Sequence, residues 1–133
     1  MRLFRFLDSI RSHLRLIEGV DLDDDISYYA TLHILQVACQ SLIDMVSLIA
    51  ASLGHLPSTY YEAGKFLVEE GAFSEEDLRR YRGIVGFRNI VVHGYLRVDR
   101  ELVKGIVRSG KYRDLERLAE KALRFAEDRG IDP

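Results

Sequence analysis

The 133-residue chain has little cysteine and little proline, and each shortage excludes something. Its single cysteine, Cys39, cannot form an intramolecular disulfide, so nothing points to a secreted disulfide-rich scaffold. Cys39 lies inside an apolar run, where we expect a small buried core residue. Because there are only two prolines, Pro57 and Pro133, long helices can run without interruption.

The chain also lacks an excess of positive charge. It has 19 lysines and arginines against 21 aspartates and glutamates, a formal net charge of −2. General nucleic-acid binding usually shows a basic surplus, so we expect no DNA partner, and any anion site must be local. Apolar residues make up 47% and charged residues 30% of the chain, which is a globular balance. We expect a single domain over residues 1–133, since this length supports one hydrophobic core.

Signals for export or membrane insertion are weak. No cationic segment followed by an apolar run and a small-residue cleavage site opens the chain. Residues 28–53 are strongly apolar, but they contain Asp44, and a carboxylate at bilayer depth costs about 2.5–3.5 kcal/mol on insertion scales. We therefore interpret this stretch as a buried helix of a cytoplasmic protein and expect no membrane association.

Apolar residues recur at steps of three and four along most of the chain, which predicts an all-α protein. Short turns with glycine separate the predicted helices. Because short connections favour antiparallel neighbours, we expect an antiparallel four-helix bundle with one or two additional short helices. The predicted helices span residues 2–18, 25–53, 58–70, 74–93, 99–109 and 111–128.

The predicted helix over residues 25–53 is apolar on two flanks. One flank is a seam of three- and four-residue steps from Leu32 to Leu53. A helix that is apolar on two flanks is usually covered on two sides. We expect one side to face the bundle, and the other could face a partner subunit. The second flank carries Ile34, Val37, Ala38, Met45 and Leu48.

Most catalytic signatures are absent as well. The chain has no nucleophile elbow, no phosphate-binding P-loop, no paired cysteines and no His-Glu-x-x-His motif. Its histidines are far apart in sequence, so we expect no zinc site, and we expect no other metal and no cofactor. The four histidines are His13, His33, His55 and His93.

What the chain does contain is a compact polar cluster in the run Phe-Arg-Asn-Ile-Val-Val-His-Gly-Tyr over residues 87–95. This run places Arg88, His93 and Tyr95 within eight residues near the predicted end of a helix. Arginine suits a phosphate because its planar guanidinium donates two parallel hydrogen bonds. Histidine gives or takes a proton near neutral pH. Together the two groups could act on a phosphodiester without a metal.

Helix geometry limits how these groups meet. Five residues turn an ideal helix by about 140°, so Arg88 and His93 do not share a face. They meet only if the helix unwinds at His93, if Arg88 reaches round, or if two copies face each other across a dimer. Asn89 and His93 do share a face, and Asn89 could orient the imidazole. The structural alternative is that His93 complements the helix dipole, Arg88 is solvated and Tyr95 packs after the helix end.

The run over residues 87–95 resembles the Arg-x4-His-x-Tyr motif of HEPN-domain proteins, specifically the HepT toxin family. The similarity covers about residues 2–127 and includes the polar row Gln36, Gln40 and Asp44. The resemblance implies a HEPN-like helical bundle that forms a homodimer and brings two motifs together in one cleft. It also implies a metal-independent endoribonuclease, the toxin of a type VII-like toxin–antitoxin pair. The implied partner is a nucleotidyltransferase antitoxin of the MntA type.

On this interpretation Arg88 and His93 are catalytic, and Asn89 and Asp44 support them. The 2′-hydroxyl of RNA would attack the adjacent phosphorus, with His93 as general base or acid. Arg88 would stabilise the charge on the phosphate oxygens, an effect worth about 3–4 kcal/mol per donor. Asp44 would orient Arg88 or His93. The antitoxin would transfer AMP to Tyr95, which adds negative charge and bulk where the RNA phosphate binds.

Two other functions fit the same residues. The chain could be a non-catalytic module that holds a nucleotide or phosphate with Arg88 and His93 and partners a nucleotidyltransferase. It could also be a structural helix-bundle dimer without a ligand, in which replacing these two residues would alter only stability. Four further arginines could contact the RNA backbone, or they could lie on an ordinary solvent-exposed face. They are Arg79, Arg80, Arg82 and Arg97.

Overall fold

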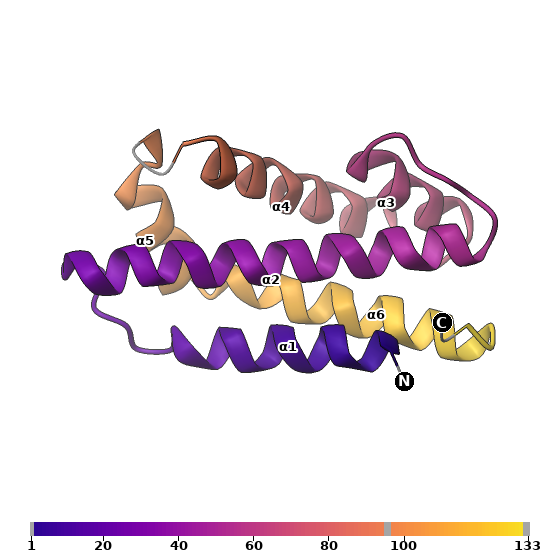
Figure 1. Cartoon of the computed structure of the whole chain (residues 1–133), viewed down its shortest axis with the longest axis horizontal. Helices are drawn as coiled ribbons and strands as arrows, with labels where there is room; N and C mark the ends of the chain where they lie inside the picture. The colour runs from indigo at the N-terminus through magenta and orange to yellow at the C-terminus, as the bar shows by residue number, and fades with distance from the viewer. Residues whose placement is uncertain (1, 95–96, 132–133) are drawn as a thin grey trace.

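The computed structural model describes residues 2–94 and 97–131, and every regular element in these two ranges is helical (Figure 1). This confirms the predicted all-α class. Helix α3 starts two residues later than predicted, and the predicted last helix opens with a 3₁₀ turn. The elements are α1 (Arg2–Leu16), α2 (Asp25–Ser52), α3 (Tyr60–Glu69), α4 (Glu75–His93), α5 (Arg100–Arg108), η2 (Lys111–Arg113) and α6 (Asp114–Asp128).

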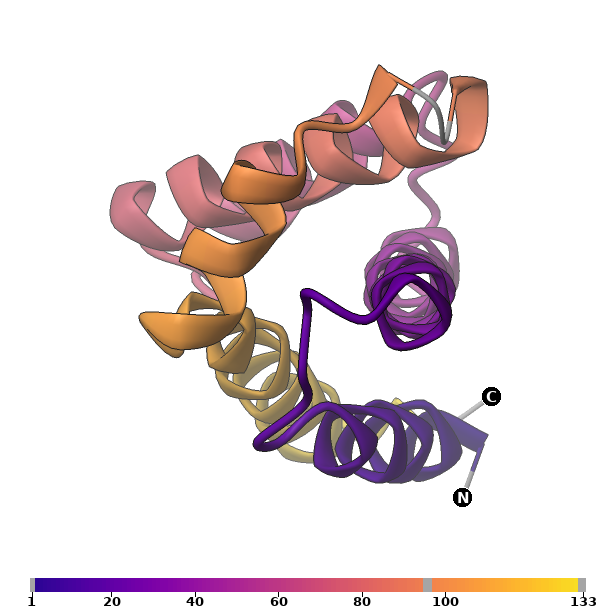
Figure 2. The same ribbon diagram turned by 90° about the vertical axis from the view of Figure 1, so that its left-hand side faces the viewer.

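Helix α2 is the central element of the bundle. It contacts α1 and α6 on one side and α3 and α4 on the other (Figure 1). The end-on view in Figure 2 shows α5 crossing from the end of α4 towards the start of α6. Helices α1 and α2 run in opposite directions, as do α4 and α6 (Figure 1). The predicted antiparallel four-helix bundle is therefore confirmed, with α3 and α5 as the additional short helices.

The starts of α2 and α4 are fixed by side-chain caps. At α2 the Asp24 carboxylate accepts a hydrogen bond from the backbone N–H of Ser27 at 2.9 Å. At α4 Ser74 and Asp77 form a capping box, in which each side chain accepts from the other residue's backbone N–H. Asp77 also accepts from Lys121 Nζ at 2.7 Å, which ties α4 to α6.

Helix α2 is long and apolar enough to cross a membrane by length and composition alone. Half of its most apolar window is nevertheless buried inside the protein. Leu32, Leu42 and Ile49 are fully buried there. Cys39 is buried with them, as predicted, and this burial raises the pKa of its thiol to about 12. We interpret α2 as the core helix of the bundle.

The second apolar flank of α2 is covered mainly by the chain itself. Ala38 and Met45 are fully buried, and Ile34 and Leu48 are half-buried against the core. This follows from the arrangement, because helices pack on both sides of α2. The flank therefore gives no independent support for a partner subunit. Several apolar side chains remain exposed in other places, among them Ile26, Tyr29, Leu56, Ile90 and Val92.

Candidate active site on helix α4

Residues 87–93 of the motif run occupy the C-terminal turns of α4, which ends at His93. The β-branched residues in it are helical, so the motif lies on one rigid element and faces both α2 and the start of α3. Tyr95, the predicted site of AMP transfer, lies outside the described residues. The remaining predicted site residues are described, and the structure places each of them.

The Arg88 guanidinium is half-buried and is held from three helices. Its Nε donates to Oε1 of Gln40 on α2 at 2.8 Å, and its Nη1 donates to Oδ1 of Asn89 at 2.9 Å. Its Cζ lies 5.3 Å from the centroid of the Tyr60 ring at the start of α3. Among the described residues, these two hydrogen bonds use two of the five guanidinium N–H groups, which leaves three for a ligand. Arg88 is thus preorganised rather than simply solvated.

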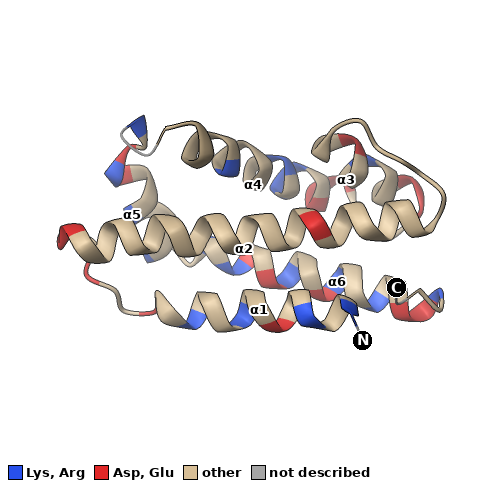
Figure 3. Cartoon of the chain, viewed as in Figure 1, with Lys and Arg blue, Asp and Glu red and all other residues tan. Residues whose placement is uncertain are grey.

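Asp44 reaches this arginine indirectly. Its Oδ1 accepts a hydrogen bond from Nε2 of Gln40 at 2.8 Å, and Gln40 in turn accepts from Arg88. Asp44 is the one aspartate, glutamate, lysine or arginine between residues 26 and 52, so α2 carries almost no charge along this face (Figure 3). The supporting role of Asp44 stays a prediction, and the contact that links Asp44 to Arg88 is Gln40, which sequence reasoning did not place at the site.

Asn89 turns towards Arg88. Helical spacing had suggested that it orients His93, but its amide oxygen accepts from the guanidinium instead. A hydrogen bond from a guanidinium cation is stronger than one between two neutral groups, which favours this contact. The Nδ2 group of Asn89 donates to no side chain or backbone group among residues 2–94 and 97–131. Two N–H groups on this amide are therefore available to a ligand.

His93 is the last residue of α4, and its side chain is exposed. Within the part of the chain that the structure describes, it forms no side-chain hydrogen bond or ion pair. Its position at the helix C-terminus complements the helix dipole, as the structural alternative predicts. A single chain therefore holds Arg88 firmly but does not pair it with His93.

A cavity of about 770 Å³ adjoins Arg88. It lies between α2, the start of α3 and α4, and Asn89 and Tyr60 line it together with Tyr61. Sequence reasoning placed neither tyrosine at the site. The available signal was a pair of adjacent aromatic residues at the first turn of a helix, next to a capping threonine.

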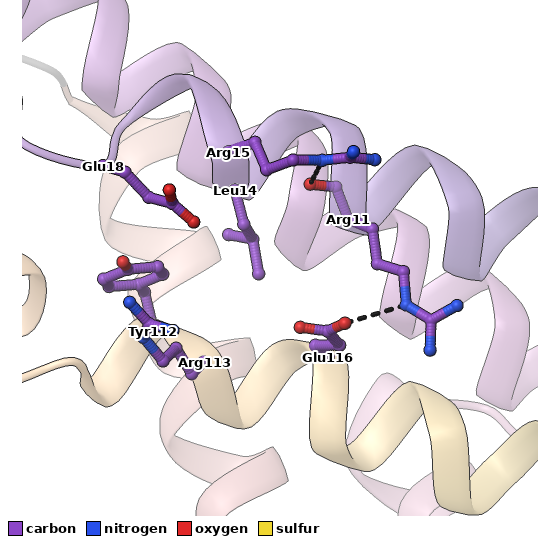
Figure 4. A pocket seen from close by; sticks show the side chains of 7 residues that line it. All are labelled: Arg11, Leu14, Arg15, Glu18, Tyr112, Arg113 and Glu116. Carbon is purple, nitrogen blue, oxygen red and sulfur yellow. Dashed lines mark hydrogen bonds and ion pairs between the residues drawn. The ribbon is translucent and has the colours of Figure 1, made fainter.

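Two further cavities lie away from Arg88. One of about 320 Å³ is lined by Arg11, Arg15 and Arg113, and Figure 4 shows Arg11 turned to Glu116 at its edge. Arg11 is paired with Glu116 at 2.8 Å and also with Glu120, and a second glutamate, Glu18, lines the same cavity. The other, of about 600 Å³, lies between α2, α4 and α6 and is mainly apolar. In the described ranges no group of three or more His, Cys, Asp or Glu side chains could hold a metal ion.

The chain matches one protein family. A family model described as "Ribonuclease HepT-like" matches residues 4–122. A comparison with curated proteins gives no match.

Several solved structures share the fold. A Bacillus subtilis protein, YutE, described as cytosolic and of unknown function, has a TM-score of 0.84 at 16% identity, over 96% of this chain and 90% of that chain. A tri-AMPylated Shewanella oneidensis HEPN toxin in complex with an MNT antitoxin has a TM-score of 0.80 at 20% identity, over 90% and 94%. A toxin–antitoxin complex with AMP-PNP has a TM-score of 0.81 at 19% identity, over 90% and 96%. These likenesses show the fold.

Proposed function

The chain belongs to the HepT-like ribonuclease family, and on that basis we propose that it is a metal-independent endoribonuclease, the toxin of a toxin–antitoxin pair. The observation that carries the proposal is the state of Arg88. Its guanidinium is fixed by Gln40, Asn89 and Tyr60 and keeps three N–H groups for a phosphate. A purely structural arginine would spend its donors inside the protein or leave them in solvent without positioning.

The proposed reaction needs only an acid, a base and a charge-stabilising donor. The 2′-hydroxyl oxygen of RNA attacks the adjacent phosphorus while the bond to the 5′-oxygen breaks, which yields a 2′,3′-cyclic phosphate and a 5′-hydroxyl. One His93 imidazole takes the proton from the 2′-hydroxyl, and a second gives a proton to the leaving 5′-oxygen. Arg88 donates to the non-bridging oxygens, where negative charge accumulates in the transition state.

The second imidazole comes from a second copy of the chain in this proposal. Arg88 and His93 point from different faces of α4, so one chain does not complete the site. Val92 and Tyr29 are 40% and 44% exposed. Val92 lies one turn beyond Arg88, and Tyr29 lies three turns before Gln40 on the same side of α2. A homodimer through this surface would cover both side chains and set two motifs opposite each other.

We further propose that a nucleotidyltransferase antitoxin silences the chain by transferring AMP to Tyr95. Tyr95 follows His93 by two residues, so an attached phosphate would compete with RNA for the free N–H groups of Arg88. A toxin with this fold is described as tri-AMPylated and in complex with an MNT antitoxin, which supports the proposal. Intact-mass analysis after co-expression with such an antitoxin would detect the addition of AMP.

The direct test offers RNA to the purified chain in the presence of EDTA. We expect cleavage to survive EDTA and to disappear in His93→Ala, while His13→Ala on α1 serves as the matched histidine control. Loss of cleavage in EDTA would contradict metal independence. Tight binding of AMP without cleavage of any RNA would favour the non-catalytic nucleotide-binding module instead.

A further inference from the structure

We propose that the cavity of about 770 Å³ beside Arg88 binds one unpaired nucleobase of the RNA, next to the scissile phosphate. In this proposal the base stacks on Tyr61, and its edge accepts a hydrogen bond from Asn89. The inference rests on the proposed function, because it takes the phosphate at Arg88 to belong to RNA. It assigns the site a substrate class, single-stranded RNA.

The cavity is continuous with the arginine site. Tyr60 and Asn89 line the cavity, and both also contact the Arg88 guanidinium. A phosphate on the free N–H groups of Arg88 would therefore place its attached nucleoside at the mouth of this cavity. Single-stranded RNA is recognised through splayed bases of this kind, which stack on aromatic side chains and hydrogen-bond through their edges.

The chemistry of the lining fits a base rather than a second phosphate. None of the described side chains that line the cavity carries a charge. Two aromatic rings, small hydroxyl groups such as that of Ser47, and apolar side chains such as Val85 make up the surface. Positive charge is confined to the neighbouring Arg88. A nucleotide matches this arrangement, because its neutral planar base suits the uncharged cavity and its phosphate suits Arg88.

The two tyrosines are exposed and yet held in place. Tyr60 and Tyr61 are 37% and 36% exposed, whereas Tyr81 is fully buried. Arg88 lies over the Tyr60 ring, and Arg82 lies over the Tyr61 ring at the same distance, 5.3 Å from each centroid. A guanidinium on one face of a ring restrains it and leaves the other face open for stacking. Arg82, although exposed, thus contacts and positions Tyr61.

The start of α3 is anchored, which fixes the backbone that carries these two rings. The Tyr81 hydroxyl on α4 donates to the backbone carbonyl of Tyr60 at 2.9 Å. Thr59 caps the helix by accepting from the backbone N–H of Glu62 at 3.1 Å. A platform of this stiffness loses little conformational entropy when a base stacks on it.

Asn89 supplies the hydrogen-bonding edge. Its Oδ1 is engaged by Arg88, so the group it offers the cavity is the Nδ2 amide, which only donates. A base with a carbonyl oxygen can accept from this amide. A ring nitrogen, such as those of adenine, can accept from it as well, so all four bases can take this hydrogen bond and we expect no strong selection among them.

The test uses a short single-stranded RNA with a 2′-deoxy nucleotide at the scissile position, which allows binding without cleavage. Abasic nucleotides are placed one at a time on each side of that position, and affinity is measured by fluorescence anisotropy. We expect one flanking abasic site to weaken binding to the wild-type chain about tenfold, within the range for base–aromatic stacking. The same abasic site should cost Tyr61→Leu nothing further, while Tyr61→Phe should behave as wild type.

Phe4→Leu is the matched control, because it removes another exposed aromatic ring, on α1 and away from the cavity. Circular dichroism confirms that each variant is folded. If every abasic position weakened RNA binding by the same factor, in the wild type and in Tyr61→Leu alike, the proposed base-binding site would be overturned. An abasic penalty in Asn89→Leu as large as that in the wild type would overturn the role of Asn89. Cleavage by the wild type alongside either result would leave the ribonuclease proposal intact, whereas failure to cleave any RNA would sink that proposal alone.

Discussion

The Arg88 guanidinium shows how much depends on the shape of one side chain. Its planar fork hydrogen-bonds Gln40 on one helix and Asn89 on its own, rests on Tyr60, and still keeps donors free. A lysine ammonium at this position would carry the same charge but only three donors on a flexible stem. It could not hold both amides and a phosphate in one plane.

Arg88→Lys should therefore lower the turnover number for RNA cleavage on the order of a hundredfold, the loss seen when a transition-state donor is removed. Single-turnover cleavage of a defined RNA measures the effect. Arg15→Lys, an exposed arginine on α1, is the control and should cleave at the wild-type rate. Activity of Arg88→Lys within twofold of wild type would mean that only the charge matters.

Asp77 makes the stability of the bundle sensitive to acid. Burial raises the pKa of its carboxyl group, but hydrogen bonds from Lys121 and Ser74 outweigh burial and hold the pKa below the ordinary value of 3.8. Because the folded-state pKa is lowered, the stabilisation is present above pH 3.8 and is lost as the pH falls below that value.

Asp77→Asn should lower the free energy of unfolding at pH 7 by about 1–3 kcal/mol, the cost of disrupting a buried hydrogen-bonded charge. The difference from wild type should shrink as the pH falls below 3.8. Urea unfolding across this pH range measures both quantities, with Asp8→Asn on α1 as the control for an exposed carboxylate. A difference that stays constant with pH would rule out the proposed linkage.

Among the secondary-structure elements, α3 depends on a close approach to α4. A Cβ atom at Gly64 would lie 2.5 Å from Cδ2 and Cε2 of Tyr81, closer than carbon atoms pack. Glycine at this position therefore lets the two helices meet, which in turn places Tyr60 and Tyr61 beside the motif. Gly83 on α4 differs, because a Cβ there would meet nothing within 4 Å.

Gly64→Ala should destabilise the protein by about 1–3 kcal/mol through overpacking. Gly83→Ala should instead stabilise it by about 0.5–1 kcal/mol, because alanine is the better helix former where space is open. Thermal unfolding of the two variants provides a matched comparison. A stable Gly64→Ala variant that keeps α3 in place would show that Tyr81 can move aside.

Helices were more predictable than the contacts between them. Apolar spacing and caps such as Asp24 and Ser74 act within a few residues, so the sequence shows them directly. The contact between Arg88 and Gln40 joins positions 48 apart, and it depends on how α4 is seated on α2. Helical spacing pairs Asn89 with His93 because it compares faces, but it cannot show that the amide oxygen of Asn89 accepts from the neighbouring guanidinium. The cavity at Tyr61 exists only through packing and has no local signature.

At the scale of the whole molecule, the proposed dimer predicts that a second copy covers the surface around the motif. Val92→Asp places a charge on the proposed dimer surface, where a monomer should tolerate it at a cost within about 0.5 kcal/mol. We expect sedimentation velocity to show a dimer for the wild type and a monomer for Val92→Asp. Leu16→Asp, an exposed position on α1, should remain dimeric. A wild-type chain that sediments as a monomer at micromolar concentration would contradict the shared site.

Within residues 2–94 and 97–131, both side chains that hydrogen-bond Arg88 are uncharged amides, and no carboxylate there is bound to its guanidinium. The protein around it is slightly acidic, with a net charge of −2, and repels polyanions at long range. Capture of RNA would then depend on a few short-range contacts, so the affinity should change little with ionic strength, with a logarithmic slope of about −0.7 per phosphate bound. Inorganic phosphate or sulfate in a buffer would occupy the same guanidinium and act as a competitive inhibitor, so activity measured in such buffers would be underestimated.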